Sequence, residues 1–157
     1  MRIVVTGGAG FIGSHVADAF LARGDDVVVV DDLSTGEKGN VPDGAAFAQA
    51  DIAEADLLGG AFGDGVDVVC HLAAQASVTV SVEDPVLDCT SNVLGTLNVC
   101  EAARRGGAPV VFASTGGALY GDDAPRPTPE TFAPQPLSPY GSSKLAGEAY
   151  VATWGRL

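Results

Sequence analysis

Basic residues are scarce in this sequence. Its 157 residues include 8 lysines and arginines against 20 aspartates and glutamates, which gives a formal net charge of −12. A field of this sign repels nucleic-acid phosphates and anionic lipid headgroups, so we expect neither as a partner. If the ligand is an anion, local groups have to hold it, because the net charge of the protein opposes it.

Cysteine and long apolar runs are also in short supply. The cysteines, Cys70, Cys89 and Cys100, are odd in number and widely spaced, which argues against a disulfide framework or a metal site. No window approaches the ~20 apolar residues of a membrane span, and the apolar run at residues 3–5 is too short for a signal peptide. We therefore expect a cytoplasmic protein with no metal ion and no membrane partner.

Glycine, in contrast, is abundant, with 21 residues, and short β-branched segments alternate with longer helical ones. Strands are expected at residues 3–5, 27–30, 45–48, 66–69 and 110–112, and helices at residues 11–23, 54–62, 84–105 and 139–155. Brief apolar strands that alternate with helices are typical of a parallel sheet buried on both faces. The predicted fold class is α/β, a Rossmann-type doubly wound parallel sheet with the strand order 3-2-1-4-5.

One segment, residues 121–136, departs from this alternation. It carries several acidic residues and a cluster of prolines, Pro125, Pro127, Pro129, Pro134 and Pro136. A surface connector is the simpler interpretation. A lid at the border of a site is the alternative, because long loops at the carboxyl ends of strands often carry function.

Residues 6–13, Thr-Gly-Gly-Ala-Gly-Phe-Ile-Gly, follow the first strand directly and open the first helix. Gly7 permits a tight turn, Gly10 lets backbone N–H groups approach a pyrophosphate, and Gly13 allows the helix to pack closely on the strand. The helix N-terminus adds about half a positive charge. Backbone dipoles can therefore hold a dinucleotide in a protein that is acidic overall.

Asp31 directly follows four valines, 18 residues beyond Gly13, and Asp32 stands beside it. A carboxylate at the end of the second strand can accept hydrogen bonds from the adenosine ribose of NAD. It would repel the 2′-phosphate of NADP, and no lysine or arginine lies within five residues of it. The sequence therefore predicts NAD as the cofactor, while Asp32 could also act as a turn cap.

The spacing of Gly7, Gly10 and Gly13 resembles that of the extended short-chain dehydrogenases/reductases, the NAD-dependent epimerase/dehydratase family, and the resemblance runs along nearly the whole chain. Asp51-Ile52 resembles the family's adenine-contacting pair, residues 71–76 its cofactor-lining loop after the fourth strand, and Asn92 its helix asparagine near the nicotinamide. The cofactor-binding residues that the resemblance implies are Gly7, Gly10, Phe11, Ile12, Gly13, Asp31, Asp32, Leu33, Ser34, Thr35, Gly36, Asp51, Ile52, Leu72, Ala73, Ala74, Gln75, Asn92, Tyr140 and Lys144. Taken singly, Asp51 could be a turn residue, His71 a strand-end imidazole and Asn92 a satisfied helix amide.

Tyr140 and Lys144 stand four residues apart, on one face of the last predicted helix. Hydride transfer at a carbinol needs a base, and a tyrosine with a pKa of about 10 is too weak at neutral pH. A lysine ammonium roughly 5 Å away contributes about 3 kcal/mol toward lowering that pKa. The pair resembles the catalytic signature of the family, and this likeness predicts that Tyr140 is the base and Lys144 its activator.

A hydroxyl after the fifth strand should complete the set. Thr115 is the expected residue, with Ser114 as the alternative. Sugar dehydratases and decarboxylases of the family resemble one another in an acid one or two residues after this threonine, where the present sequence has Gly116 and Gly117. The chemistry that remains is oxidation at C4, rotation of the 4-keto sugar and hydride return. This predicts a nucleotide-sugar 4-epimerase acting on a UDP-hexose of the UDP-glucose/UDP-galactose type.

Extended members of the family run to roughly twice this length, with a C-terminal domain that binds the nucleotide sugar. Residues 1–157 are therefore expected to form one incomplete NAD-binding Rossmann domain, truncated before the last strands and without the substrate domain. Strand 110–112 would then be an uncovered sheet edge, which favours homodimers or other self-association. A non-catalytic NAD-binding module is the alternative function, although such a module needs no proton-transfer tyrosine.

Overall fold

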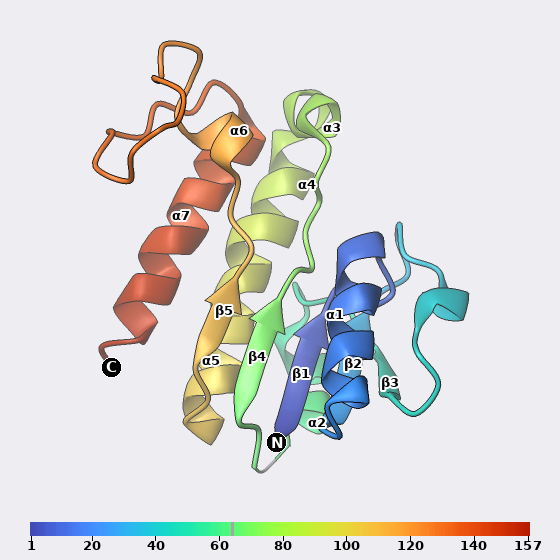
Figure 1. The fold of residues 1–157 in the computed structure, drawn as a ribbon. Coiled ribbons are helices and arrows are strands. Elements are labelled where there is room, and N and C mark those ends of the chain that lie inside the picture. Colours follow the sequence, from blue (N-terminus) through green and yellow to red (C-terminus); the bar gives the residue numbers. More distant parts are fainter. Residues whose placement is uncertain (64) are drawn as a thin grey trace.

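A five-stranded parallel sheet with the order β3-β2-β1-β4-β5 lies at the centre of the structure (Figure 1), a computed structural model that describes residues 1–63 and 65–157. The strands are β1 (Arg2–Thr6), β2 (Asp26–Asp31), β3 (Ala46–Gln49), β4 (Val68–His71) and β5 (Val110–Phe112). Every neighbouring pair runs parallel. The predicted fold class and strand order are confirmed.

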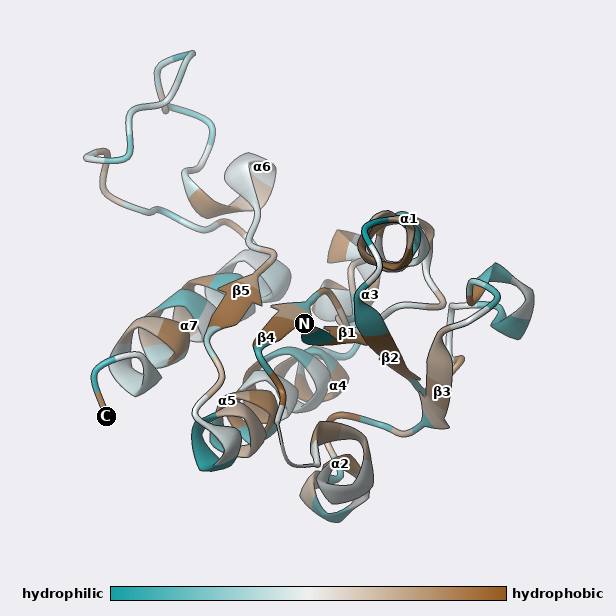
Figure 2. Cartoon of the chain, turned by 60° about the horizontal axis from the view of Figure 1, so that its bottom comes forward, coloured by the Kyte–Doolittle hydropathy of each residue, from teal (hydrophilic) through white to brown (hydrophobic). Residues whose placement is uncertain are grey.

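Helices lie on both faces of the sheet, which explains why the middle residues of β1 and β2 are apolar and buried. The elements outside the sheet are α1 (Phe11–Ala22), η1 (Lys38–Asn40), α2 (Ala55–Phe62), α3 (Val78–Glu83), α4 (Pro85–Cys89), η2 (Thr90–Leu94), α5 (Gly95–Gly106), α6 (Gly116–Leu119) and α7 (Pro139–Trp154). α1 lies on one face, and α2, α5 and α7 lie on the other (Figure 2). Successive residues of β1 alternate between the two resulting cores, with Ile3 and Val5 on the α1 side and Val4 on the opposite side.

The long helix predicted at residues 84–105 is a continuous helical path in three parts, because α4 leads through η2, a π-helical turn, into α5. Pro85 occupies its first turn and Asp84 caps it through the Leu87 N–H. Gly107 ends it with a left-handed φ of 70°. Sequence periodicity cannot show a π turn, since one such turn only shifts the helical phase by a single residue.

Three short elements were not predicted, namely α3, α6 and η1. Each is at most 6 residues long, which is too short for apolar periodicity to emerge. Side-chain caps mark two of them, because Ser77 accepts from the Val80 N–H and Thr115 from the Ala118 N–H. β4 also begins two residues later than expected and includes His71.

Residues 121–136 contain neither helix nor strand and extend beside α6, beyond the carboxyl ends of the strands (Figure 1). The segment folds back on its own start, because Gln135 donates from its N–H to the Leu119 carbonyl oxygen at 2.9 Å. Tyr120 and Phe132 close it with an edge-to-face ring contact at 6.3 Å. The prediction of an irregular connector is confirmed, and the lid remains a prediction. Within the described residues, no helix is both long and apolar enough to cross a membrane.

Candidate active site

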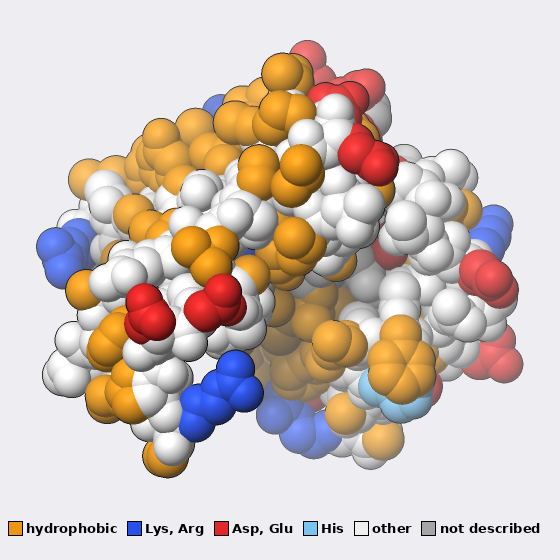
Figure 3. Space-filling view, turned by 90° about the horizontal axis from the view of Figure 1, so that it is seen from above, with side chains coloured by type: hydrophobic (Ala, Val, Ile, Leu, Met, Phe, Trp, Pro, Cys, Tyr) orange, Lys and Arg blue, Asp and Glu red, His pale blue; other side chains and the backbone are white. Residues whose placement is uncertain are grey.

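The carboxyl ends of the parallel strands meet at one edge of the sheet, where the predicted site residues gather. Seen from that side, the surface is hollowed and hydrophobic side chains line the recess (Figure 3). Open parallel sheets bind ligands at this edge. Among the described residues, no group of three or more histidines, cysteines and acids is arranged to hold a metal ion.

The glycine-rich turn after β1 has the tight geometry expected of it. Gly7 has a φ of 72°, and a Cβ there would lie 2.6 Å from the backbone nitrogen of Ala73 in the loop after β4. A Cβ on Gly13 would overlap the carbonyl oxygen of Gly7. The first turn of α1 has no side-chain cap and no acidic residue, so its N–H groups are left to a ligand. Phe11 and Ile12 belong to this turn, and their side chains are exposed. The free N–H groups of the turn suit a pyrophosphate.

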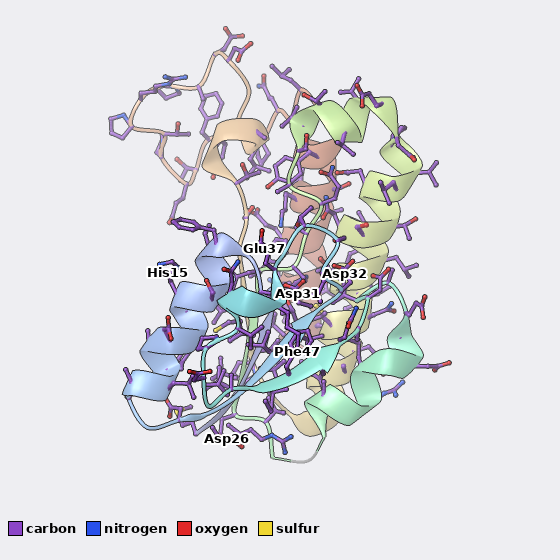
Figure 4. The ribbon with its side chains drawn as sticks, turned by 90° about the vertical axis from the view of Figure 1, so that its right-hand side faces the viewer. His15, Asp26, Asp31, Asp32, Glu37 and Phe47 are labelled. Atoms are coloured by element: carbon purple, nitrogen blue, oxygen red, sulfur yellow. The ribbon has the colours of Figure 1, made fainter. Side chains whose placement is uncertain are left out.

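Asp31 and Asp32 lie at the end of β2 that faces this turn, opposite to Asp26 (Figure 4). The buried Asp31 carboxylate accepts from the Ala9 N–H at 3.0 Å and from the Leu33 N–H at 2.9 Å, and so fixes the glycine-rich turn to β2. Two bonds do not exhaust a carboxylate, which has about four acceptor sites. Asp32 accepts from the N–H and hydroxyl of Ser34 and therefore caps a turn, the role left open for it.

The next predicted cofactor-binding residues, 33–36, lie in the loop after β2. Leu33 has a left-handed φ of 64°. Ser34 and Thr35 are exposed. A Cβ on Gly36 would lie 3.0 Å from the Oδ1 atom of Asp31, so this position admits only glycine without rearrangement. The structure thus brings the two ends of the segment, Asp31 and Gly36, next to Ala9 of the turn.

Asp51 and Ile52, the pair predicted to contact adenine, make mainly internal contacts in this structure. The Asp51 carboxylate accepts from the Ala53 N–H at 2.8 Å. The Ile52 side chain is buried in the core against Gly95, and the Asn98 amide donates to the Ile52 carbonyl oxygen. A ligand contact at this pair stays a prediction.

His71 is wholly buried and links three elements. Its Nδ1 lies 2.7 Å from the Thr6 hydroxyl on β1, and its Nε2 lies 3.0 Å from the Thr96 hydroxyl on α5. Thr6 also accepts from the Ala73 N–H, and Thr96 donates to the Asn92 carbonyl oxygen. Burial, and secondarily Lys144, lowers the pKa of His71 to about 3. The imidazole is therefore neutral and structural, and it holds the loop after β4 next to Gly7.

Leu72, Ala73, Ala74 and Gln75 form that loop and are all half-buried. The Asn92 side chain, 2% exposed, anchors the loop because its oxygen accepts from the Gln75 N–H and its amide donates to the Gln75 carbonyl oxygen. The second amide hydrogen goes to Asp88. Asn92 is thus a satisfied helix amide in this structure, and a direct contact with a nicotinamide stays a prediction.

Tyr140, Lys144 and Thr115 come together at the ends of β5 and α7. The Thr115 side chain lies near enough to the Tyr140 hydroxyl to lower the pKa of that group. The Lys144 Nζ atom lies 5.9 Å from the centre of the Tyr140 ring and donates to the Ala113 carbonyl oxygen at 2.9 Å. Ser114 is exposed, whereas Thr115 is half-buried. The identity of the third member, Thr115 or Ser114, stays a prediction.

The electrostatics of the pair differ from the expectation. The pKa of Tyr140 is raised, first by burial and then by the charge of Asp88, against a smaller lowering by the Thr115 hydrogen bond. The pKa of Lys144, whose side chain is 4% exposed, is lowered to about 8 by burial, against a raising effect of Asp88. Without a cofactor, Lys144 does not bring the Tyr140 pKa down, because burial weakens the charged forms of both groups.

Asp88 was not predicted as a site residue. It is wholly buried on α4 and contacts Gln75, Asn92 and Ser143. A signal was available in the spacing, because Asp88 and Asn92 stand four residues apart in a predicted helix and so share one face. Only the packing of α7 against α4 shows that this face is buried and borders the Tyr140 helix.

Residues 3–157 match the model of the NAD dependent epimerase/dehydratase family, and the chain belongs to this family. It is 47% identical over 156 residues to the putative UDP-glucose 4-epimerase of Methanocaldococcus jannaschii, covering 99% of this chain and 51% of that protein. The crystal structure of Thermus thermophilus UDP-glucose 4-epimerase in complex with NAD superposes with a TM-score of 0.91 at 49% identity, and that of the Thermotoga maritima enzyme with UDP-glucose superposes with 0.93 at 42%. These matches cover 99% of this chain and 51% and 52% of those chains. The chain thus spans about half the length of the relatives it matches.

Proposed function

We propose that this chain is the NAD-binding part of a nucleotide-sugar 4-epimerase of the UDP-glucose/UDP-galactose type. The observation that carries the proposal is the placement of Lys144 beside the Tyr140 ring at 5.9 Å, with Thr115 near the Tyr140 hydroxyl, at the sheet edge that also holds the glycine-rich turn. A module that only binds a dinucleotide needs no such proton-transfer set. The names of the relatives support the same class, since the solved structures from T. thermophilus and T. maritima are of UDP-glucose 4-epimerases.

The residues present fit NAD. The uncapped first turn of α1 suits the pyrophosphate, and the remaining acceptor sites of Asp31 suit the ribose hydroxyls. Lys38 is the first basic residue after Asp31 in the sequence. Its Nζ atom lies over the Phe47 ring, 5.5 Å from the ring centre. NAD, when bound, supplies the hydride acceptor and donor for C4 of the sugar.

The chain's own residues manage the proton of the sugar hydroxyl. As the phenolate, Tyr140 would take the proton of the C4 hydroxyl when C4 is oxidised, and as the resulting phenol it would return that proton when C4 is reduced on the opposite face. Thr115 favours the charged form of Tyr140, because its side chain lowers the pKa of the Tyr140 hydroxyl. Lys144 holds a positive charge beside the Tyr140 ring while its ammonium group donates to the Ala113 carbonyl oxygen.

The residues after Thr115 support epimerisation over dehydration. Gly116 and Gly117 form the first turn of α6, and a Cβ at either would meet open space. Because both positions are glycine, neither supplies a carboxylic acid that could expel a C6 hydroxyl. The next acids along the chain, Asp122 and Asp123, follow Gly121 in the irregular segment.

Cofactor titration tests the proposal. By isothermal calorimetry the 157-residue chain should bind NAD at least tenfold more tightly than NADP, a difference of about 1.4 kcal/mol or more. Asp31→Asn should narrow this ratio. Asp26→Asn removes the same charge from the opposite end of β2 (Figure 4) and should leave the ratio unchanged. Equal affinities for the two cofactors in the parent chain would remove Asp31 from its role.

A further inference from the structure

Asp88 is a wholly buried carboxylate in the middle of polar contacts. Its Oδ1 accepts from the Gln75 amide at 3.1 Å and from the Asn92 amide at 2.9 Å, and its Oδ2 accepts from the Ser143 hydroxyl at 2.6 Å. All three partners act as donors, which matches an ionised carboxylate. Among the described residues the structure gives Asp88 no ion-pair partner within 4.0 Å.

The three donors come from three parts of the site. Gln75 belongs to the loop after β4, Asn92 to the π turn η2, and Ser143 to α7. Ser143 is 6% exposed and directly precedes Lys144. One carboxylate therefore ties the helix that carries Tyr140 to the loop that rests on Gly7.

A buried charge costs stability unless hydrogen bonds satisfy it. Replacing a buried ionic group by an apolar one is often neutral or stabilising, so stability alone does not account for a carboxylate at this position. The charge does act on its surroundings, because Asp88 raises the pKa of both Tyr140 and Lys144. At Tyr140 the charge of Asp88 acts in the same direction as burial. At Lys144 it opposes the lowering of the pKa by burial.

We propose that Asp88 is a positioning residue for the Tyr140–Lys144 pair: it fixes α7 through Ser143 to the loop after β4, and it places a buried negative charge beside the helix that carries the pair. The proposal rests on the proposed function in one respect, that Tyr140 and Lys144 transfer the proton of the sugar hydroxyl. The contacts of Asp88 do not depend on a bound cofactor.

The other titratable groups around the pair are few. His71 on β4 is neutral and feels the charge of Lys144. Glu148, half-buried, lies further along α7, and Glu83 and Asp84 are exposed at the ends of α3 and α4. None of these three acids is among the causes of the Lys144 shift, which are burial and Asp88.

The charge is tested by titrating Lys144 itself. The sequence has only two lysines, Lys38 and Lys144, so carbon-13 lysine labelling gives two signals and Lys38→Arg assigns them. In the cofactor-free chain the Lys144 signal should titrate near pH 8. In Asp88→Asn the midpoint should fall by roughly half a unit or more, because a nearby negative charge is lost. Glu148→Gln removes one charge from the same helix as Lys144 and should leave the midpoint unchanged.

The tether is tested by amide hydrogen exchange across α7. Ser143→Ala removes the bond to Asp88, while Ser142→Ala is the same change at an exposed neighbour. Exchange in the first two turns of α7 should be at least several-fold faster in Ser143→Ala than in Ser142→Ala, with the amides of β1 and β2 unaffected.

An unchanged Lys144 midpoint in a folded Asp88→Asn, or equal exchange in the two serine variants, overturns the proposal. If Asp88→Asn does not fold by circular dichroism, the serine pair decides alone. Neither measurement needs NAD or turnover. A chain that binds no NAD but shows both effects would therefore refute the proposed function and leave the arrangement of Asp88 and the pair intact.

Discussion

Tyr140 is half-buried, lies near the Thr115 side chain and stands one helical turn before Lys144 on α7. In an active epimerase that contains this domain, Tyr140→Phe should lower turnover by about a hundredfold or more, because the ring remains while the proton acceptor is lost. Tyr150→Phe is the matched control, since Tyr150 lies on the same helix and packs its ring on Trp154 at 5.8 Å. Turnover is measured as conversion of UDP-galactose to UDP-glucose. Near-full activity in Tyr140→Phe would sink the mechanism.

His71 should make the fold sensitive to acid. Its pKa is about 3 in the folded chain against an ordinary 6.5. Below pH 6.5 the unfolded chain gains a proton that the folded chain does not, so stability falls as the pH drops from 6.5 toward 3. The free energy of unfolding should decline by up to about 1.4 kcal/mol per pH unit from this residue.

Urea unfolding at several pH values between 5 and 7.5 measures this slope. His71→Gln keeps polar groups at the position but does not titrate, so its slope should be shallower. His15→Gln, a change at the exposed histidine of α1, should keep the parent slope. Equal slopes in the parent and in His71→Gln would contradict the prediction.

At the scale of elements, the close packing of α1 on the glycine-rich turn requires that Gly13 has no Cβ. Gly13→Ala should destabilise the chain by roughly 1–3 kcal/mol and abolish NAD binding, since the new methyl overlaps the Gly7 carbonyl oxygen. Gly60→Ala in α2 is the matched control, because a Cβ there meets nothing within 4 Å. That change should stabilise the chain by up to about 1 kcal/mol. Chemical unfolding and calorimetry measure both effects, and a Gly13→Ala variant that still binds NAD would refute this view of the turn.

At the scale of the whole molecule, β5 is an edge strand of the sheet, and its Val111 is 61% exposed. An apolar edge without a charged residue favours pairing with a second copy. We therefore expect dimers or larger species by light scattering at micromolar concentration, and a shift toward monomer in Val111→Lys. Val86→Lys, at a valine 72% exposed on α4, is the control. If that variant dissociates the assembly and Val111→Lys does not, the contact lies on α4 and the edge prediction is wrong.

The sequence by itself determined the sheet and the cofactor-facing turn. Buried parallel strands must be short and apolar, and a turn that brings a helix N-terminus over a strand admits only glycine at positions such as Gly7 and Gly13. Steric requirements of this kind are local, so they are legible in the order of residues. The helical spacing of Tyr140 and Lys144 is local for the same reason.

Only the tertiary structure decided what depends on distant segments. Asp88 and Ser143 are 55 residues apart in the chain and meet only because α7 packs against α4. The internal hydrogen bonds of Asn92 and the raised pKa of Tyr140 follow from such packing. Burial and the field of a neighbouring charge depend on the sum of all surrounding atoms, and no window of sequence contains that sum.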